Sequence, residues 1–172
     1  MLLKVEMGYP TYGFLAVENR VLEGTLERIY KKLEEFELSF GAPRKRYTDL
    51  KIITHITTLF TTIKFIYYSV PTDDDYFWYD EVKFGESTNI KVELTDKFEQ
   101  LKKKYRCDDC PDTQQCYSCY TKADHEFLMS KIEYIKNHMK ENNMKIFGPE
   151  DTEIIMPGHE IIGYEFFEDD LD

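Results

Sequence analysis

Several features typical of enzymes and membrane proteins are missing from this 172-residue chain. No segment approaches the roughly 18 consecutive apolar residues that a transmembrane helix needs. The N-terminal residues lack a charged leader, an apolar stretch and a cleavage site, so they do not resemble a secretory signal and we expect an intracellular protein. Nucleotide-binding, metalloprotease and nucleophile-elbow motifs are also missing. We therefore assign no catalytic residue and expect neither a membrane nor a small-molecule substrate.

Alanine is scarce, with three residues against 13 Tyr and 12 Phe. Ala, Gly and Pro are encoded by GC-rich codons, whereas Lys, Ile, Tyr, Phe and Asn are encoded by AT-rich codons. The composition therefore indicates an AT-rich genome, such as that of a large DNA virus, a phage, a low-GC bacterium or a protist.

Positive charge is in the minority. The chain has 33 Asp and Glu against 22 Lys and Arg, which gives a net charge of −11. Binding to bare nucleic acid depends on neutralising phosphates, so this balance disfavours it. We expect a protein partner instead. An alternative that uses the acidity directly is a nucleic-acid mimic that inhibits a host or defence protein by occupying its binding groove.

The hydrophobic pattern predicts an α+β fold of short antiparallel strands and hairpins packed with about four helices. Apolar steps of three and four from Leu22 to Phe40 predict an amphipathic helix that ends at Gly41. Residues 49–70 combine helical spacing with strand-forming Thr, Ile and Tyr; we interpret them as a helix, with two strands as the alternative. Other strands are expected at 2–6, 12–17, 76–84 with 89–94 around Gly85, and 152–156 with 160–167.

Two more helices are expected beside the cysteines. Thr95 is a candidate cap for a short helix, and Thr121-x-x-Asp124 resembles a capping box that opens a helix ending near Asn142. Within one compact domain we expect an α+β core at 1–106, a metal-binding element at 107–125, and a helix, hairpin and acidic tail at 126–172.

All four cysteines lie within thirteen residues, as C-x2-C-x5-C-x2-C. Two such pairs can supply four thiolates to one tetrahedral zinc ion and leave no position open for water, which is the pattern of a structural site. Two disulfides, a redox pair and an iron–sulfur cluster are the alternatives. The predicted cofactor is zinc, and its predicted ligands are Cys107, Cys110, Cys116 and Cys119.

The segment from Tyr105 to Cys110, followed by Pro111-Asp112 and the second cysteine pair, resembles the second half of a ZZ-type zinc finger. The resemblance covers about 20 of the 172 residues. In that family the two pairs serve different zinc ions, which need an upstream cysteine pair and two downstream histidines. This chain has no upstream cysteine, and only His125 lies downstream, with His138 in the following helix. The resemblance implies a small zinc-stapled interaction surface. One zinc on four cysteines is the preferred interpretation, with a cysteine pair and His125 as the fallback.

The acidic, aromatic stretch 73–81 contains the only Trp and is a candidate partner-binding surface. Aromatic side chains are enriched in interface cores, and surrounding charge steers the encounter. The alternative is a hairpin with Phe77 and Tyr79 packed inside. The acidic, aromatic tail at 164–170 has a similar composition. The candidate contact residues in the first stretch are Asp73, Asp74, Asp75, Trp78, Tyr79 and Asp80.

A basic patch, Arg44-Lys45-Arg46, is a second candidate contact. If it met Lys102–Lys104 on one face, the chain would be a zinc-bearing nucleic-acid factor. His55 lies in an H-x-T element with no second copy, so we interpret it as a histidine on a polar helix side; an enzyme using it, or using a non-structural cysteine pair, is a further hypothesis. Our main prediction is a non-enzymatic, zinc-binding protein that acts in protein–protein interaction or as an assembly subunit.

Overall fold

The computed structural model describes residues 11–36, 43–44, 46–71, 74–112 and 114–147. The predicted strands at 2–6, 152–156 and 160–167, and the acidic tail, lie outside these residues. The fold is α+β, as predicted. The strands are β1 (Thr11–Glu18), β2 (Pro43–Arg44), β3 (Phe65–Val70), β4 (Tyr76–Lys83), β5 (Glu86–Glu93) and β6 (Met144–Ile146), and the helices are α2 (Glu23–Glu35), α3 (Arg46–Leu59), α4 (Thr95–Lys104) and α5 (Tyr117–Glu141).

One antiparallel sheet organises the molecule, with strand order β2-β1-β3-β4-β5. Strand β6 pairs with the end of β1 near Glu18, on the same side as β2. The two short strands β2 and β6 therefore share one border of the sheet, and β5 forms the other.

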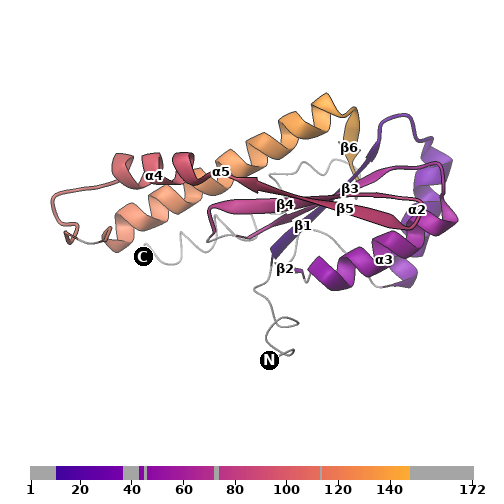
Figure 1. Cartoon of the computed structure of the whole chain (residues 1–172), viewed down its shortest axis with the longest axis horizontal. Helices are drawn as coiled ribbons and strands as arrows, with labels where there is room; N and C mark the ends of the chain where they lie inside the picture. The colour runs from indigo at the N-terminus through magenta and orange to yellow at the C-terminus, as the bar shows by residue number, and fades with distance from the viewer. Residues whose placement is uncertain (1–10, 37–42, 45, 72–73, 113, 148–172) are drawn as a thin grey trace.

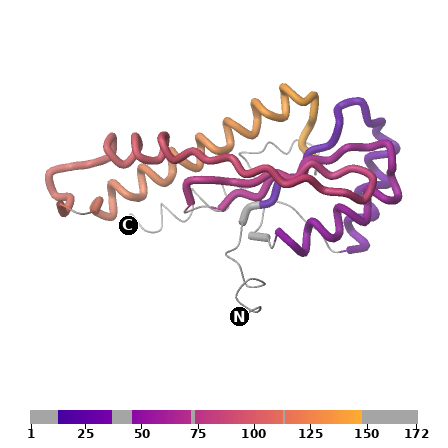
Figure 2. Tube along the Cα trace, in the orientation of Figure 1, coloured from indigo at the N-terminus to yellow at the C-terminus, as the bar shows by residue number. Residues whose placement is uncertain are grey.

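Helices cover both faces of this sheet (Figures 1 and 2). Successive strand residues point to opposite faces, so Leu15 and Val17 of β1 pack against α2 and α3, whereas Phe14 and Ala16 pack against α5. Strand β3 is buried along its whole length. This two-sided burial removes the apolar–polar alternation by which a strand is usually recognised.

Gly13 in β1 allows one close contact inside this core. A Cβ atom built there would lie 2.2 Å from the hydroxyl oxygen of Tyr67. That hydroxyl donates to Oδ2 of buried Asp49 at 2.5 Å. The absence of a side chain at Gly13 thus lets Tyr67 of β3 reach the carboxylate on α3.

The α4–α5 hairpin extends beyond the sheet (Figure 1). The C-terminal part of α5 covers the sheet, whereas its N-terminal part packs against α4 around Leu101, Ala123 and Phe127. Among the described residues, none of the helices combines the length and the apolar character needed to cross a membrane.

The amphipathic helix and the central hairpin are confirmed. The first is α2, which ends at Glu35 with Phe36 in the C-cap position, so the predicted end near Gly41 is wrong. The second is β4–β5, where Phe84 and Gly85 both have positive φ, at 59° and 75°. Positive φ at both turn residues defines a type I′ turn, which joins strands tightly and favours glycine.

Two predicted elements are wrong in detail. Residues 49–70 are neither one helix nor two strands: α3 ends at Leu59 and β3 begins at Phe65. A strand buried on both faces has apolar residues along its whole length, so apolar steps of three and four can be found in it. This is why the spacing of residues 49–70 suggested one helix. The capping box is also wrong, because α5 begins at Tyr117 and the Thr121 hydroxyl donates to the Ser118 carbonyl inside the helix.

Candidate metal centre

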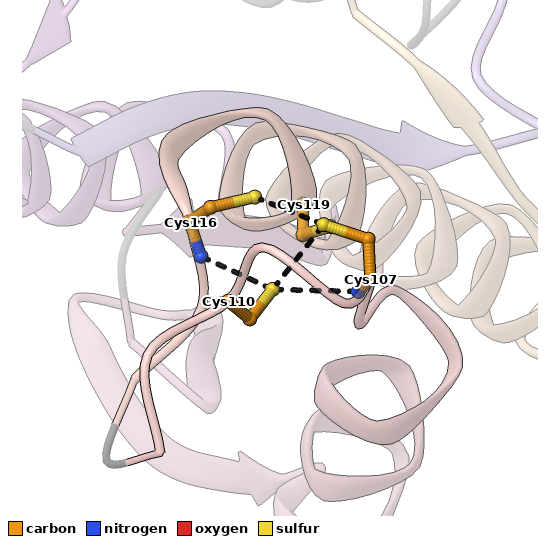
Figure 3. Close-up of side chains that lie close together, drawn as sticks. All are labelled: Cys107, Cys110, Cys116 and Cys119. Carbon is orange, nitrogen blue, oxygen red and sulfur yellow. Dashed lines mark hydrogen bonds between the residues drawn. The ribbon is translucent and has the colours of Figure 1, made fainter.

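The four cysteines lie at the tip of the α4–α5 hairpin. Cys107 and Cys110 follow α4, Cys116 is the residue that caps α5, and Cys119 lies in the first turn of α5 (Figure 3). The first pair comes from a loop and the second from a helix start. Their side chains converge on one point from the two helices of the hairpin.

All four sulfur atoms lie within 4.8 Å of one another. The Sγ atoms of Cys107 and Cys110 are 3.7 Å apart, and those of Cys107 and Cys116 are 3.6 Å apart. A disulfide would require about 2.05 Å, and all four cysteines are free. Tetrahedral Zn–S bonds of about 2.3 Å place sulfur atoms about 3.8 Å apart. The five-residue spacer therefore lets both pairs reach one ion, as the single-ion interpretation requires.

Backbone N–H groups already favour the charged form of one thiol. The amides of Cys116 and Cys107 point at Sγ of Cys110, at 3.3 and 3.4 Å. The hydrogen bond from the Cys116 amide, followed by that from the Cys107 amide, lowers the pKa of Cys110 to about 6. A thiolate is the form that binds metal.

The thiols of Cys107 and Cys119 resist ionisation when no cation is present. The side-chain contact with Cys116, followed by desolvation, raises the pKa of Cys119 to about 12. The contact with Cys116 also raises the pKa of Cys107. Four thiolates this close repel one another, and a divalent cation removes that repulsion. The cluster is thus chemically suited to a metal ion.

Gln115 orders the loop in a way that the sequence did not indicate. Its side-chain amide donates to the carbonyls of Lys102 and Tyr105, at 3.1 and 2.6 Å, and so satisfies the C-terminal end of α4. The Arg106 guanidinium donates to the Pro111 carbonyl within the loop. A glutamine in a polar loop carries no pattern that identifies it as a helix cap.

The acidic, aromatic stretch is largely part of the fold. Phe77 is fully buried, and the partly buried Tyr79 packs against the same core, as the hairpin interpretation expected. Asp80, predicted as a contact residue, is 1% exposed and accepts hydrogen bonds from Arg46 and Asn89. A carboxylate this buried is part of the interior of the fold and cannot serve as an exposed contact.

The other described residues of that stretch are at most partly exposed. Trp78 packs edge-on against Tyr76, at 4.8 Å between ring centroids. Asp75 accepts a hydrogen bond from the Thr95 hydroxyl, which therefore does not cap α4. Asp74 and Asp75 are half-buried, and Asp73 lies outside the described residues.

The described residues of the two basic clusters belong to different elements of the fold. Arg46 begins α3 and is paired with Asp80, whereas Lys102–Lys104 end α4 in the projecting hairpin (Figure 1). Lys104 pairs with Glu126, at 3.0 Å. The side chain of Arg44 is not described, and Lys45 lies outside the described residues.

In the described part of the chain, no histidine belongs to the cysteine cluster. His125 lies further along α5 than the four ligands and is not in their cluster. His55 is exposed on α3, where its ring contacts Phe36 edge-on at 5.6 Å. Within the described residues, the candidate metal centre therefore consists of sulfur atoms alone.

Comparisons with known proteins identify no relative. No protein-family model matches the chain, and neither the curated proteins nor the solved structures include a significant match. The function must therefore be inferred from the geometry of the molecule itself.

Proposed function

We propose that this protein is a non-enzymatic interaction module in which one zinc ion, held by the four cysteines, fixes the α4–α5 hairpin for contact with a protein partner. The observation that carries the proposal is the convergence of four sulfur atoms within 4.8 Å. Four thiolates favour zinc, and a filled tetrahedron leaves no position for a substrate. The ion then acts structurally.

The hairpin tip offers a contact surface. Tyr117 and Tyr120, on the first turns of α5, are 54% and 45% exposed. Tyrosine is enriched at protein interfaces because a large apolar ring carries a polar hydroxyl. Both residues flank Cys119 in the sequence, so a metal ion bound there would fix the backbone that presents them.

Metal analysis tests the first half of the proposal. Protein purified without added metal should contain one zinc per chain by element-specific mass spectrometry. Cobalt substitution should give the absorption of a tetrahedral tetrathiolate site. Zinc well below one per chain, or iron with inorganic sulfide, would contradict it. Cys110→Ser should remove the metal, and Ser118→Ala, in the first turn of α5 between Cys116 and Cys119, is the control.

Partner capture tests the second half. Cross-linking in cells of the native source should recover a protein partner with the wild-type chain. The double variant Tyr117→Ala, Tyr120→Ala should lose that partner while retaining zinc. Tyr30→Ala is the control, because Tyr30 is 40% exposed on α2, away from the tip. If Tyr30→Ala lost the partner and the double variant kept it, the hairpin tip would not be the contact surface.

A further inference from the structure

Strand β5 is a long, open edge of the sheet. It is eight residues long and, among the described residues, pairs only with β4. An edge strand presents backbone N–H and C=O groups that can pair with another chain. None of its eight residues is buried: six are exposed, and Ile90 and Val92 are half-buried, so the edge is accessible.

The type I′ turn determines which groups face outward. In a two-residue hairpin the residues beside the turn, Lys83 and Glu86, form a hydrogen-bonded pair. Alternate residues from Glu86 onward therefore direct their backbone groups toward β4. The groups that face outward belong to Ser87, Asn89, Lys91 and Glu93.

A groove of about 540 Å³ lies beside this edge, between α3 and the β4–β5 hairpin. Lys51 and His55 line it from α3, and Ser87 and Asn89 line it from β5. Asp80 also borders it, but its charge is neutralised by Arg46 at 2.9 Å. Lys51 therefore gives the groove a positive charge, although the net charge of the whole chain is −11.

We propose that β5 and α3 together form a docking site for an extended, acidic peptide of a partner protein. The peptide adds to β5 as a further strand, and its backbone pairs with the outward-facing groups. Every second side chain then enters the groove, where an acidic group meets Lys51. The intervening side chains lie on the opposite face, beside half-buried Ile90 and Val92. The site therefore selects alternating acidic and apolar residues.

A second copy of the chain fits the groove less well. A β5 strand from another copy would direct its own Lys91 and Glu93 toward the α3 face, because both belong to the outward-facing set. These two side chains bring no net charge to meet Lys51. Charge complementarity thus favours an acidic partner peptide over self-association.

Fluorescence anisotropy on the full chain tests this site. The probe is a labelled peptide of alternating Glu and Val, with alternating Lys and Val as its charge control. We expect the acidic probe alone to bind. Lys51→Glu should weaken binding at least about fivefold. Lys140→Glu, which makes the same charge change at an exposed position on α5, should leave binding unchanged.

Methylation of the peptide backbone distinguishes strand addition from charge attraction. N-methyl groups on one alternate set of peptide amides should abolish binding, whereas those on the other set should not, because only one set faces β5. Equal effects of the two sets, equal binding of the basic probe, or no binding would overturn the proposal. A peptide-independent dimer in sedimentation, abolished by Lys91→Pro, would assign the edge to a second copy and also overturn it.

The peptide site and the cysteine cluster lie in different parts of the molecule. An experiment can therefore contradict the peptide proposal without contradicting the zinc proposal, and the reverse. Removing the metal with a chelator should leave binding of the acidic probe unchanged, because α3 and β5 belong to the sheet half of the molecule. Probe binding that disappears with the metal would contradict the placement of the site at β5.

Discussion

The sheet and the α4–α5 hairpin are stabilised in different ways. The sheet has a large apolar cluster on each face, and side chains such as Phe65 and Phe77 are fully buried. The hairpin beyond the sheet has three buried apolar residues, Leu101, Ala123 and Phe127. Hydrophobic stabilisation scales with buried apolar area, so the hairpin needs a further source of stability. A metal ion bound as proposed would join the end of α4 to the start of α5 and so make the hairpin rigid.

Lys131 marks the boundary between these two regions. Its side chain is fully buried in α5, and its ammonium group donates to the carbonyls of Pro71 and Asp74, at 2.7 and 2.5 Å. It also lies 4.9 Å from the ring centroid of Phe127 in the hairpin core. The single helix α5 therefore passes from the hairpin to the sheet at a point where it is anchored to the strand connection.

Metal removal should separate the two regions most strongly. We expect chelation, or Cys110→Ser, to unfold the loop and the first turns of α5 while β3 and β4 stay folded. Hydrogen exchange measured by mass spectrometry should show protection falling at least about a hundredfold in the segment 105–122. The sheet segments should be unaffected. Uniform loss of protection across both regions would show that they form one cooperative unit.

A cavity in the sheet core should destabilise the sheet and leave metal binding in the hairpin unchanged. Phe77→Ala removes a fully buried ring from the face covered by α5. We expect the free energy of unfolding, measured by urea titration, to fall by about 3–5 kcal/mol. Zinc content of the protein that remains folded should stay at one per chain. Zinc loss in parallel with unfolding of the sheet would contradict the separation.

The same division explains what the sequence could predict. The cysteine spacing correctly predicted that the four cysteines lie together, because C-x2-C is a local geometry that needs no tertiary information. Helix α2 and the β4–β5 turn were also predictable from an apolar stripe and from Gly85. Local patterns were sufficient for these elements, but not for the end of α3 or the start of α5.

The failures involve contacts between distant residues. Strand β3 is buried on both faces, so its sequence has no alternation to read. The carboxylate of Asp80 was interpreted as exposed because its partner, Arg46, is 34 positions away. The Gln115 side chain reaches carbonyls 10 and 13 positions back. None of these pairings has a spacing that periodicity detects.

Gln115 provides a smaller test confined to the hairpin. Gln115→Ala should leave the carbonyls of Lys102 and Tyr105 without their side-chain donor. The cost should be about 1 kcal/mol of local stability, read as faster hydrogen exchange at the end of α4. Gln114→Ala is the matched control, because Gln114 is exposed in the same loop. Equal changes in hydrogen exchange in the two variants would show that Gln115 does not cap α4.

His138 should give the smallest effect, and it belongs to the sheet region. Its Nδ1 lies 2.8 Å from the Tyr68 hydroxyl, and its ring lies 4.4 Å from that of Tyr79. Desolvation lowers the pKa of His138, and the nearby Lys64 lowers it further, against Glu81 and Glu141, which raise it. The unfolded chain therefore takes up a proton more readily than the folded one as the pH falls below about 6.5. Protonation would also prevent Nδ1 from accepting a hydrogen bond from Tyr68.

Stability should thus be highest above that pH and decline modestly below it. In urea titrations between pH 5 and 8, about the range where an ordinary histidine titrates, His138→Gln should show a smaller decline than the wild type. His55→Gln should match the wild type, since His55 is exposed on α3. A wild-type decline that His138→Gln leaves unchanged would place the titrating group elsewhere. Because His138 packs on the sheet, hydrogen exchange in the hairpin should not follow this pH dependence. The pH response would then belong to the sheet region alone.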